Sequence, residues 1–254
     1  MQMKMKWAKN VGVAATAVAV LATGSSAFAQ VFPVQTVVNN TSTKTGNEYT
    51  PPTGTEFGNQ VVITAANPDT GANSAANNIW ALQTMSFEFN SGAAVAGSAV
   101  GSAVVNIYKN TGPLAAGPNS QSPSPMVYTS GSFNLTGTGA SGGTVTLTSI
   151  NVYVPTTFTW TVTFTSANGA ILGLDTYGPP TAGNVFNDIW QKTGSAWELL
   201  QPNGANQANG TPANFASFGQ QFTAIPAPEP GTIAMGVMGL LATGGMLFGK
   251  RKNA

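Results

Sequence analysis

The sequence predicts an all-β protein, an antiparallel β-sandwich with one helix ahead of it and one behind it. Between the chain ends the sequence is rich in Gly, Ser, Thr, Asn, Ala and Val and poor in Lys and Glu, a composition that suits strands joined by turns. Short segments there alternate apolar and polar residues with a period of two, and no long helical period appears. A third observation, an uncharged apolar run near each end of the chain, predicts the two flanking helices.

The N-terminal run is typical of a secretory signal peptide. A lysine-rich start precedes an apolar run over residues 11–24, which is too short to span a bilayer comfortably, and Ala27 and Ala29 then form an Ala-x-Ala cleavage site. We expect residues 1–29 to direct the chain to the Sec translocon and to be removed by signal peptidase after Ala29. An uncleaved N-terminal anchor is the alternative.

The clearest predicted strand covers residues 157–165. Threonine occupies every second position, and the residues between them are apolar: Phe158, Trp160, Val162 and Phe164. This alternation predicts a half-buried antiparallel strand whose apolar face points into the core. The threonine face is β-branched and hydroxylated, so we expect it to face water without losing strand preference.

Further strands are expected in segments with a similar alternation or a short apolar run: 61–65, 80–90, 104–109, 127–129, 132–135, 144–150, 151–154, 186–191, 197–200 and 218–223. Turn residues such as Asn-Gly and Gly-Pro-Pro separate them. Many short strands at this spacing indicate a two-sheet sandwich, because a parallel sheet would need crossover helices. The polar segment 36–58 is interpreted as turn-rich, leading into a strand at residues 56–59. The Pro-rich segment 113–125 is interpreted as a surface loop, and 93–103 as a loop running into a strand.

Composition excludes several functions for residues 30–225, the predicted exported domain. This segment carries three basic and seven acidic residues, a net charge of −4. So few basic residues cannot form a phosphate-neutralising surface, which excludes nucleic-acid binding. The chain has no Cys and no His, which excludes disulfides, thiol or imidazole nucleophiles, the usual zinc sites and the common haem ligands. We expect no cofactor, no metal site and no enzyme activity.

The C-terminal segment 226–254 combines three features in a fixed order. Pro228, Glu229 and Pro230 form a rigid stretch, because proline blocks a helix and holds the backbone extended. The uncharged run 231–249 follows, and as a helix it measures about 28 Å, enough to span the hydrocarbon core of a bilayer. The tail 250–254 carries a basic cluster that favours the cytoplasmic side of a membrane: Lys250, Arg251 and Lys252.

These three features together resemble the PEP-CTERM protein-sorting signal. The resemblance implies that exosortase, a multi-spanning membrane transpeptidase, processes the tail near Pro228-Glu229-Pro230 after transient anchoring in the inner membrane. It also implies a Gram-negative, polysaccharide-producing host. The expected destination is the cell surface or extracellular matrix, with a structural or adhesive role linked to exopolysaccharide. A plain C-terminal anchor that is never cut is the alternative.

The domain between the two ends is similar, more loosely, to the choice-of-anchor β-sandwich domains that often precede such tails. The similarity follows from the order of four segments: 86–89, 105–112, 152–160 and 188–197. Because those domains are similar to jelly rolls, the resemblance implies a jelly-roll-like sandwich. It implies no particular activity.

Trp190 and Trp197 are candidate glycan contacts. They flank a turn near two acidic residues, and the face of an indole can stack on a sugar ring. Such contacts would make the protein a carbohydrate-binding module for exopolysaccharide, whereas a packed hairpin would explain the same pair without a ligand. Glycan hydrolase or lyase chemistry would need two converging carboxylates. Sequence spacing singles out no pair among the candidates: Glu88, Asp175, Asp188 and Glu198.

Overall fold

A computed structural model describes the following parts of the chain: residues 33–63, 79–92, 97–113, 121–137, 142–167, 169–186, 189–200 and 217–227. The chain divides into two compact units, and the unit Val34–Ala227 contains every strand of the described residues. The predicted signal peptide, membrane span and basic tail lie outside the described residues. Within the described ranges, no helix is long and apolar enough to cross a membrane.

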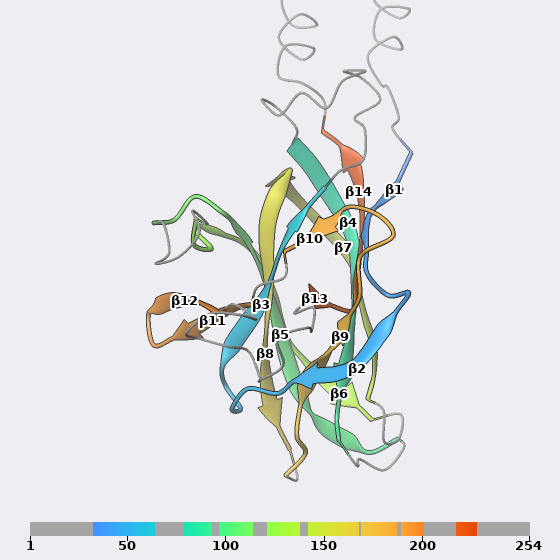
Figure 1. The fold of residues 1–254 in the computed structure, drawn as a ribbon, viewed down its shortest axis with the longest axis vertical. Helices are drawn as coiled ribbons and strands as arrows, with labels where there is room; N and C mark the ends of the chain where they lie inside the picture. The colour runs from blue at the N-terminus through green and yellow to red at the C-terminus, as the bar shows by residue number, and fades with distance from the viewer. Residues whose placement is uncertain are drawn as a thin grey trace, which may run out of the picture. The chain divides into compact units, whose positions relative to one another are not determined.

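The first sheet, sheet A, is antiparallel and has seven strands (Figure 1). They are β1 (Gln35–Asn39), β2 (Lys44–Tyr49), β4 (Ile79–Asn90), β7 (Gly143–Pro155), β9 (Gly173–Tyr177), β13 (Ser217–Phe218) and β14 (Gln220–Pro226). β4 pairs with β7 along one side and with β14 and then β9 along the other. β1 lies beyond β14, while β2 and β13 both pair with β9.

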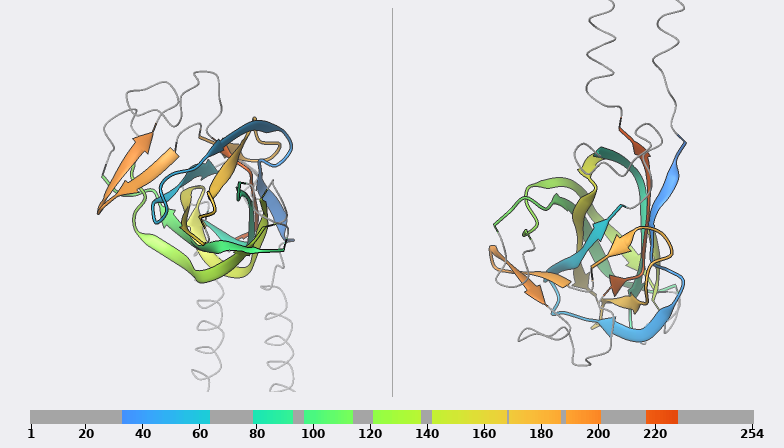
Figure 2. Two further views of the ribbon diagram at one scale, coloured as in Figure 1. Left: turned by 90° about the horizontal axis from the view of Figure 1, so that it is seen from below. Right: turned by 45° about the horizontal axis from the view of Figure 1, so that its top comes forward.

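Sheet B also has seven antiparallel strands. They are β3 (Glu56–Val62), β5 (Ala99–Lys109), β6 (Met126–Thr136), β8 (Thr157–Ser166), β10 (Asn184–Val185), β11 (Ile189–Thr193) and β12 (Ala196–Leu200). Their order is β12-β11-β3-β8-β5-β6, and β10 pairs with β3. The hairpin β11–β12 extends to one side of the sandwich (Figure 2).

Aromatic side chains join the two sheets face to face. Trp160 in β8 lies 5.6 Å from Phe87 in β4, measured between ring centroids, and Phe158 lies 5.2 Å from Phe222 in β14. The core cluster draws all of its residues from the unit Val34–Ala227. Because this unit has its own hydrophobic core and the size of an ordinary domain, we expect it to fold without the two chain ends.

The all-β prediction is confirmed in the described residues, although several boundaries differ. The strand predicted over 157–165 is β8, with its four apolar side chains buried as expected. The predicted strands 127–129 and 132–135 form one strand, β6, and the predicted strands 144–150 and 151–154 form one strand, β7. Irregularities at Gly131, Ser149 and Asn151, where φ is positive, bend these strands without ending them.

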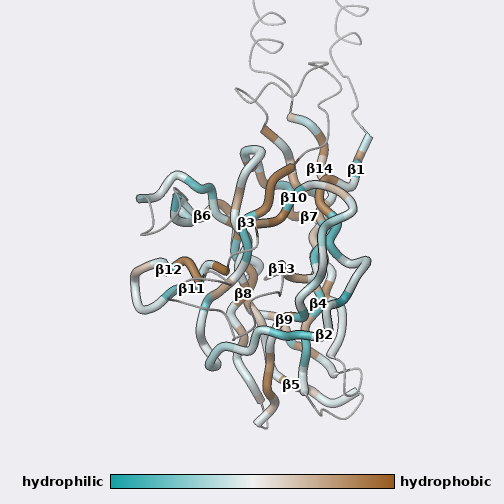
Figure 3. Tube along the Cα trace, viewed as in Figure 1, coloured by the Kyte–Doolittle hydropathy of each residue, from teal (hydrophilic) through white to brown (hydrophobic). Residues whose placement is uncertain are grey.

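The interpretation of residues 36–58 as a polar, turn-rich region is wrong. This segment contains the strands β1 and β2, whereas the strand expected to start at residues 56–59 is present as β3. β2 is hydrophilic along most of its length (Figure 3), and Tyr49 is its only buried residue. Because β2 lies on the outside of β9, it gains backbone hydrogen bonds without an apolar face, and alternation therefore does not reveal it.

The threonine face of β8 does not face water at its centre. Thr159 and Thr161 are fully buried. The hydroxyl of Thr159 donates to Oδ1 of Asn110 at 2.7 Å, and that of Thr161 donates to Oε1 of Glu56 at 2.8 Å. The outer face of sheet B, which points away from the core, is thus covered here by a second layer of polar side chains.

The two ends of the sandwich unit lie side by side. In β1 and β14, Gln35 pairs with Ala224, and β14 continues through Pro226, one residue beyond the predicted boundary at 225. The backbone N–H of Ala227 then donates to the carbonyl of Ile79 at 2.9 Å. The sandwich therefore closes directly before the Pro-Glu-Pro sequence.

Candidate functional site

Glu56 is the centre of a polar cluster on the outer face of sheet B. It opens β3, where its neighbour Phe57 is buried in the core, so the Glu56 side chain points to the opposite face. Its Oε1 accepts hydrogen bonds from side chains of two neighbouring strands: Asn106 at 2.8 Å, Tyr108 at 2.7 Å and Thr161 at 2.8 Å. Its Oε2 forms an ion pair with Nζ of Lys192 in β11 at 3.1 Å. Four donors thus converge on one carboxylate.

These contacts hold Glu56 in its charged form. Burial raises its pKa, but the hydrogen bonds from the four donors outweigh burial, so its pKa lies below the ordinary value of 4.5. Burial also raises the pKa of Tyr108, and the hydrogen bond to the Glu56 carboxylate raises it further. The cluster at neutral pH is therefore a carboxylate anion surrounded by neutral donors and one ammonium group.

Trp197 borders this cluster. Its ring meets that of Tyr108 edge to face, with the centroids 5.3 Å apart, and Nζ of Lys192 lies 5.3 Å from the Trp197 ring centroid. Trp197 is half-buried and stands opposite Lys192 in the hairpin β11–β12. A half-exposed indole beside a carboxylate, an amide and an ammonium group is an arrangement that can stack on a sugar ring and hydrogen-bond its hydroxyls.

The prediction that Trp190 contacts a glycan is wrong for this structure. Trp190 is fully buried, so it offers no ring face to a ligand. It stands opposite Gly58 in β3 on one side and Leu199 in β12 on the other. The packed-hairpin alternative therefore applies to Trp190. Of the predicted pair, Trp197 alone keeps a partly exposed ring.

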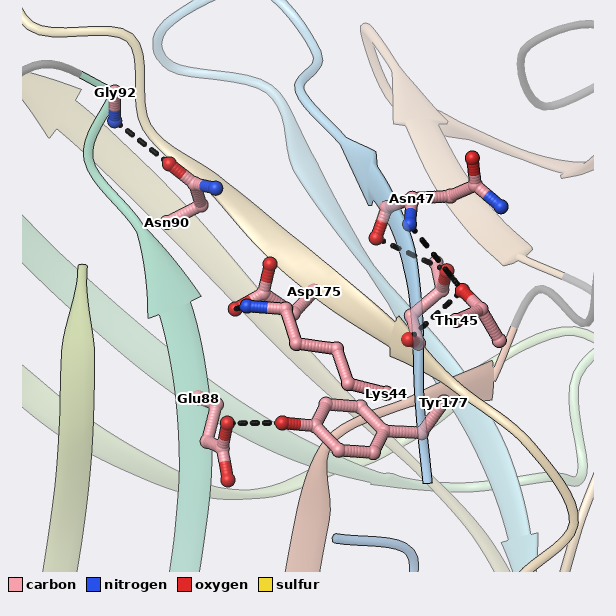
Figure 4. Close-up of polar contacts among 9 residues, drawn as sticks. Lys44, Thr45, Asn47, Glu88, Asn90, Gly92, Asp175 and Tyr177 are labelled. Carbon is pink, nitrogen blue, oxygen red and sulfur yellow. Dashed lines mark hydrogen bonds and ion pairs between the residues drawn. The ribbon is translucent and has the colours of Figure 1, made fainter. Parts of the chain in front are cut away.

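A second polar cluster lies on the outer face of sheet A (Figure 4). The carboxylate of Asp175 in β9 is almost fully buried and pairs with Nζ of Lys44 in β2 at 2.7 Å. The hydroxyl of Tyr177 donates to Oε2 of Glu88 in β4. Burial, the hydrogen bond from Tyr177 to Glu88 and the nearby charges of Glu88 and Asp175 all raise the pKa of Tyr177, so it stays a neutral donor.

These contacts bear on the carboxylates considered for glycan cleavage. Glu88 and Asp175 both approach Tyr177, but each already has a partner, Tyr177 for Glu88 and Lys44 for Asp175. Glu198 lies in β12, in a different sheet, and Asp188 lies outside the described residues. In the part of the chain that the structure describes, no group of three acidic residues could hold a metal ion.

The residues predicted for sorting and signal cleavage lie outside the described ranges: Ala27, Ala29, Pro228, Glu229, Pro230, Lys250, Arg251 and Lys252. Their roles therefore stay predictions from the sequence.

In its described residues the chain is thus an all-β protein with two antiparallel sheets. Each sheet carries a polar cluster with a carboxylate on its outer face, around Glu56 in sheet B and around Glu88 and Asp175 in sheet A. No protein-family model, curated protein or solved structure matches the chain.

Proposed function

We propose that this chain is an exported PEP-CTERM-type protein that exosortase processes and that serves a structural or adhesive role in the cell envelope or extracellular matrix, linked to exopolysaccharide. Its central part is then a jelly-roll-like domain of the choice-of-anchor kind. One observation supports this most directly. Among the described residues, the last backbone hydrogen bond of the sandwich is that of Ala227, and Pro228 begins the other unit.

This position suits a processing signal. A protease or transpeptidase binds its substrate as an extended peptide, so its target must lie outside the folded domain. A cut near Pro228-Glu229-Pro230 would remove no strand of the sandwich, and neither would removal of residues 1–29, because β1 begins at Gln35. The two ends of the unit itself, in β1 and β14, lie side by side.

Replacing Pro228, Glu229 and Pro230 with alanine should abolish processing. We expect full-length protein to accumulate in the membrane fraction of the native host, because the extended motif is lost while the apolar run is kept. Immunoblotting of membrane and released fractions, with mass spectrometry of both termini, measures the outcome. The matched control replaces Pro51 and Pro52, which lie in the turn before β3, and should be released normally. Unchanged release and mass of the triple variant would refute the processing step.

Trp197 favours a second candidate function, a carbohydrate-binding module. We expect the domain to be retained on exopolysaccharide from its host in affinity electrophoresis, and Trp197→Ala to reduce the association constant about tenfold or more, because stacking on a ring supplies a large share of such binding. Tyr153→Ala is the matched control, since Tyr153 is an exposed aromatic residue in β7 of the other sheet. Equal retention of both variants, or no retention of the native domain, would argue against glycan binding at Trp197.

A further inference from the structure

The sandwich has one side on which both sheets end in an open strand. In the described residues, β7 pairs only with β4 and β6 pairs only with β5. Both are long, over Gly143–Pro155 and Met126–Thr136. Their outer backbone N–H and C=O groups can accept another strand, which is the usual way in which sheets extend across a protein interface.

Apolar side chains are concentrated on the same two strands. Seven partly buried apolar residues pack against the edge of the core, and six of them lie in β6 or β7: Val127, Tyr128, Phe133, Val145, Leu147 and Val152. Met126 and Tyr153, two of the exposed large apolar residues, are in these strands too. The core is thus least covered where the sheet edges are open. Burying these side chains would favour association.

Apart from the irregularities at Gly131, Ser149 and Asn151, neither strand carries the features that normally protect an edge. Neither contains a charged residue, and proline occurs only at the last position of β7. The other outer strands differ. β2 contains Lys44 and Glu48, β12 contains Glu198, and β1 is partly covered because the backbone of Asn39 bonds to residues 181 and 182. An uncharged edge can face a copy of itself without repulsion.

We propose that two copies of this chain associate through β7, paired antiparallel about a two-fold axis at Thr146. The regular part of β7 sets this position, because its pairing with β4 is regular over residues 143–148 and shifts between residues 148 and 152, where Ser149 and Asn151 have positive φ. Pairing of this kind continues sheet A from one copy into the other. It covers the partly buried Val145 and Leu147, which lie opposite each other across the axis. Charge on the strand does not oppose this pairing.

This register places Thr144 of one copy opposite Thr148 of the other, twice in the dimer. Both threonines are exposed, so substitution should not disturb the monomer. Two double variants then differ in one residue. Thr144→Lys with Thr148→Lys sets like charges opposite each other, whereas Thr144→Lys with Thr148→Glu sets opposite charges there.

The test uses the native domain from Gln30 to Ala227 and both variants in sedimentation equilibrium. We expect the native domain to dimerise, the Lys/Lys variant to associate about tenfold more weakly, and the Lys/Glu variant to associate at least as tightly as the native domain. The gap between the variants should shrink at high salt. Hydrogen exchange of the native domain should show protection of residues 143–148 that increases with protein concentration.

A native domain that stays monomeric, or two variants that associate equally, would overturn the proposal. Equal melting temperatures of the variants as monomers would exclude misfolding as the cause of any difference. Because the domain lacks the tail, the result does not depend on exosortase processing or on glycan binding.

Discussion

Trp160→Ala is expected to lower the free energy of unfolding by about 4 kcal/mol, the cost of removing a large aromatic side chain from a packed core. Trp160 is fully buried in β8. Its ring contacts those of Phe87, Phe218 and Phe222, and its Nε1–H donates to the side chain of Gln220. The substitution therefore leaves a cavity between the sheets and an unpaired acceptor.

Urea denaturation followed by circular dichroism measures this loss for the domain from Gln30 to Ala227. Trp197→Ala serves as the matched control, because it removes an equal side chain that is only half-buried. We expect the control to cost clearly less. A Trp160→Ala domain that unfolds at the native urea midpoint would contradict the arrangement of the core described here.

Glu56→Ala is expected to cost about 3 kcal/mol, because it leaves three hydrogen-bond donors and the ammonium of Lys192 without their common acceptor. Glu56→Gln keeps one oxygen for the three donors and loses the ion pair alone, so about 1 kcal/mol is expected. Glu48→Ala removes an exposed carboxylate of the same type from β2 and should be nearly neutral. An equal cost at positions 48 and 56 would show that the cluster does not stabilise the fold.

The Glu56 cluster also predicts a pH dependence. The pKa of Glu56 is lower in the folded protein than its ordinary value of 4.5, so the folded state favours the ionised carboxylate. Its contribution to stability is complete well above pH 4.5 and is lost as the pH falls through the lowered pKa. Urea midpoints measured from neutral to acidic pH should fall less steeply for Glu56→Gln than for the native domain. Parallel curves would contradict the assignment.

The sequence predicts the strands that have an apolar face and misses those that lack one. β8 is evident because its apolar residues alternate over the whole strand, whereas β2 is held by backbone pairing to β9 and has a single buried residue. A strand with an apolar face can be predicted from its local sequence pattern. A strand without one forms because it pairs with a distant segment, and such pairing leaves no periodic pattern in the sequence.

The same limit explains the outcome at the candidate site. Trp190 and Trp197 look alike in the sequence, but Trp190 lies between β3 and β12 and is fully buried, whereas Trp197 is only half-buried. Glu56 gives no signal, because its partners lie 50 to 136 residues further along the chain, on three other strands. The alternation of Asn106 and Tyr108 along β5 is the one local hint, since it places two donors on the same face.

The neighbouring position of β1 and β14 sets how the domain would respond to mechanical load. A force applied between the two ends of the unit would open the ladder from Gln35 and Ala224 inward and break its hydrogen bonds one after another. If the domain is instead held through Ala227 and pulled from the opposite end of the sandwich, β14 slides along β4, and all the bonds from Gln220 to Pro226 resist together. Attachment through the C-terminal end alone therefore gives this fold its stronger loading geometry.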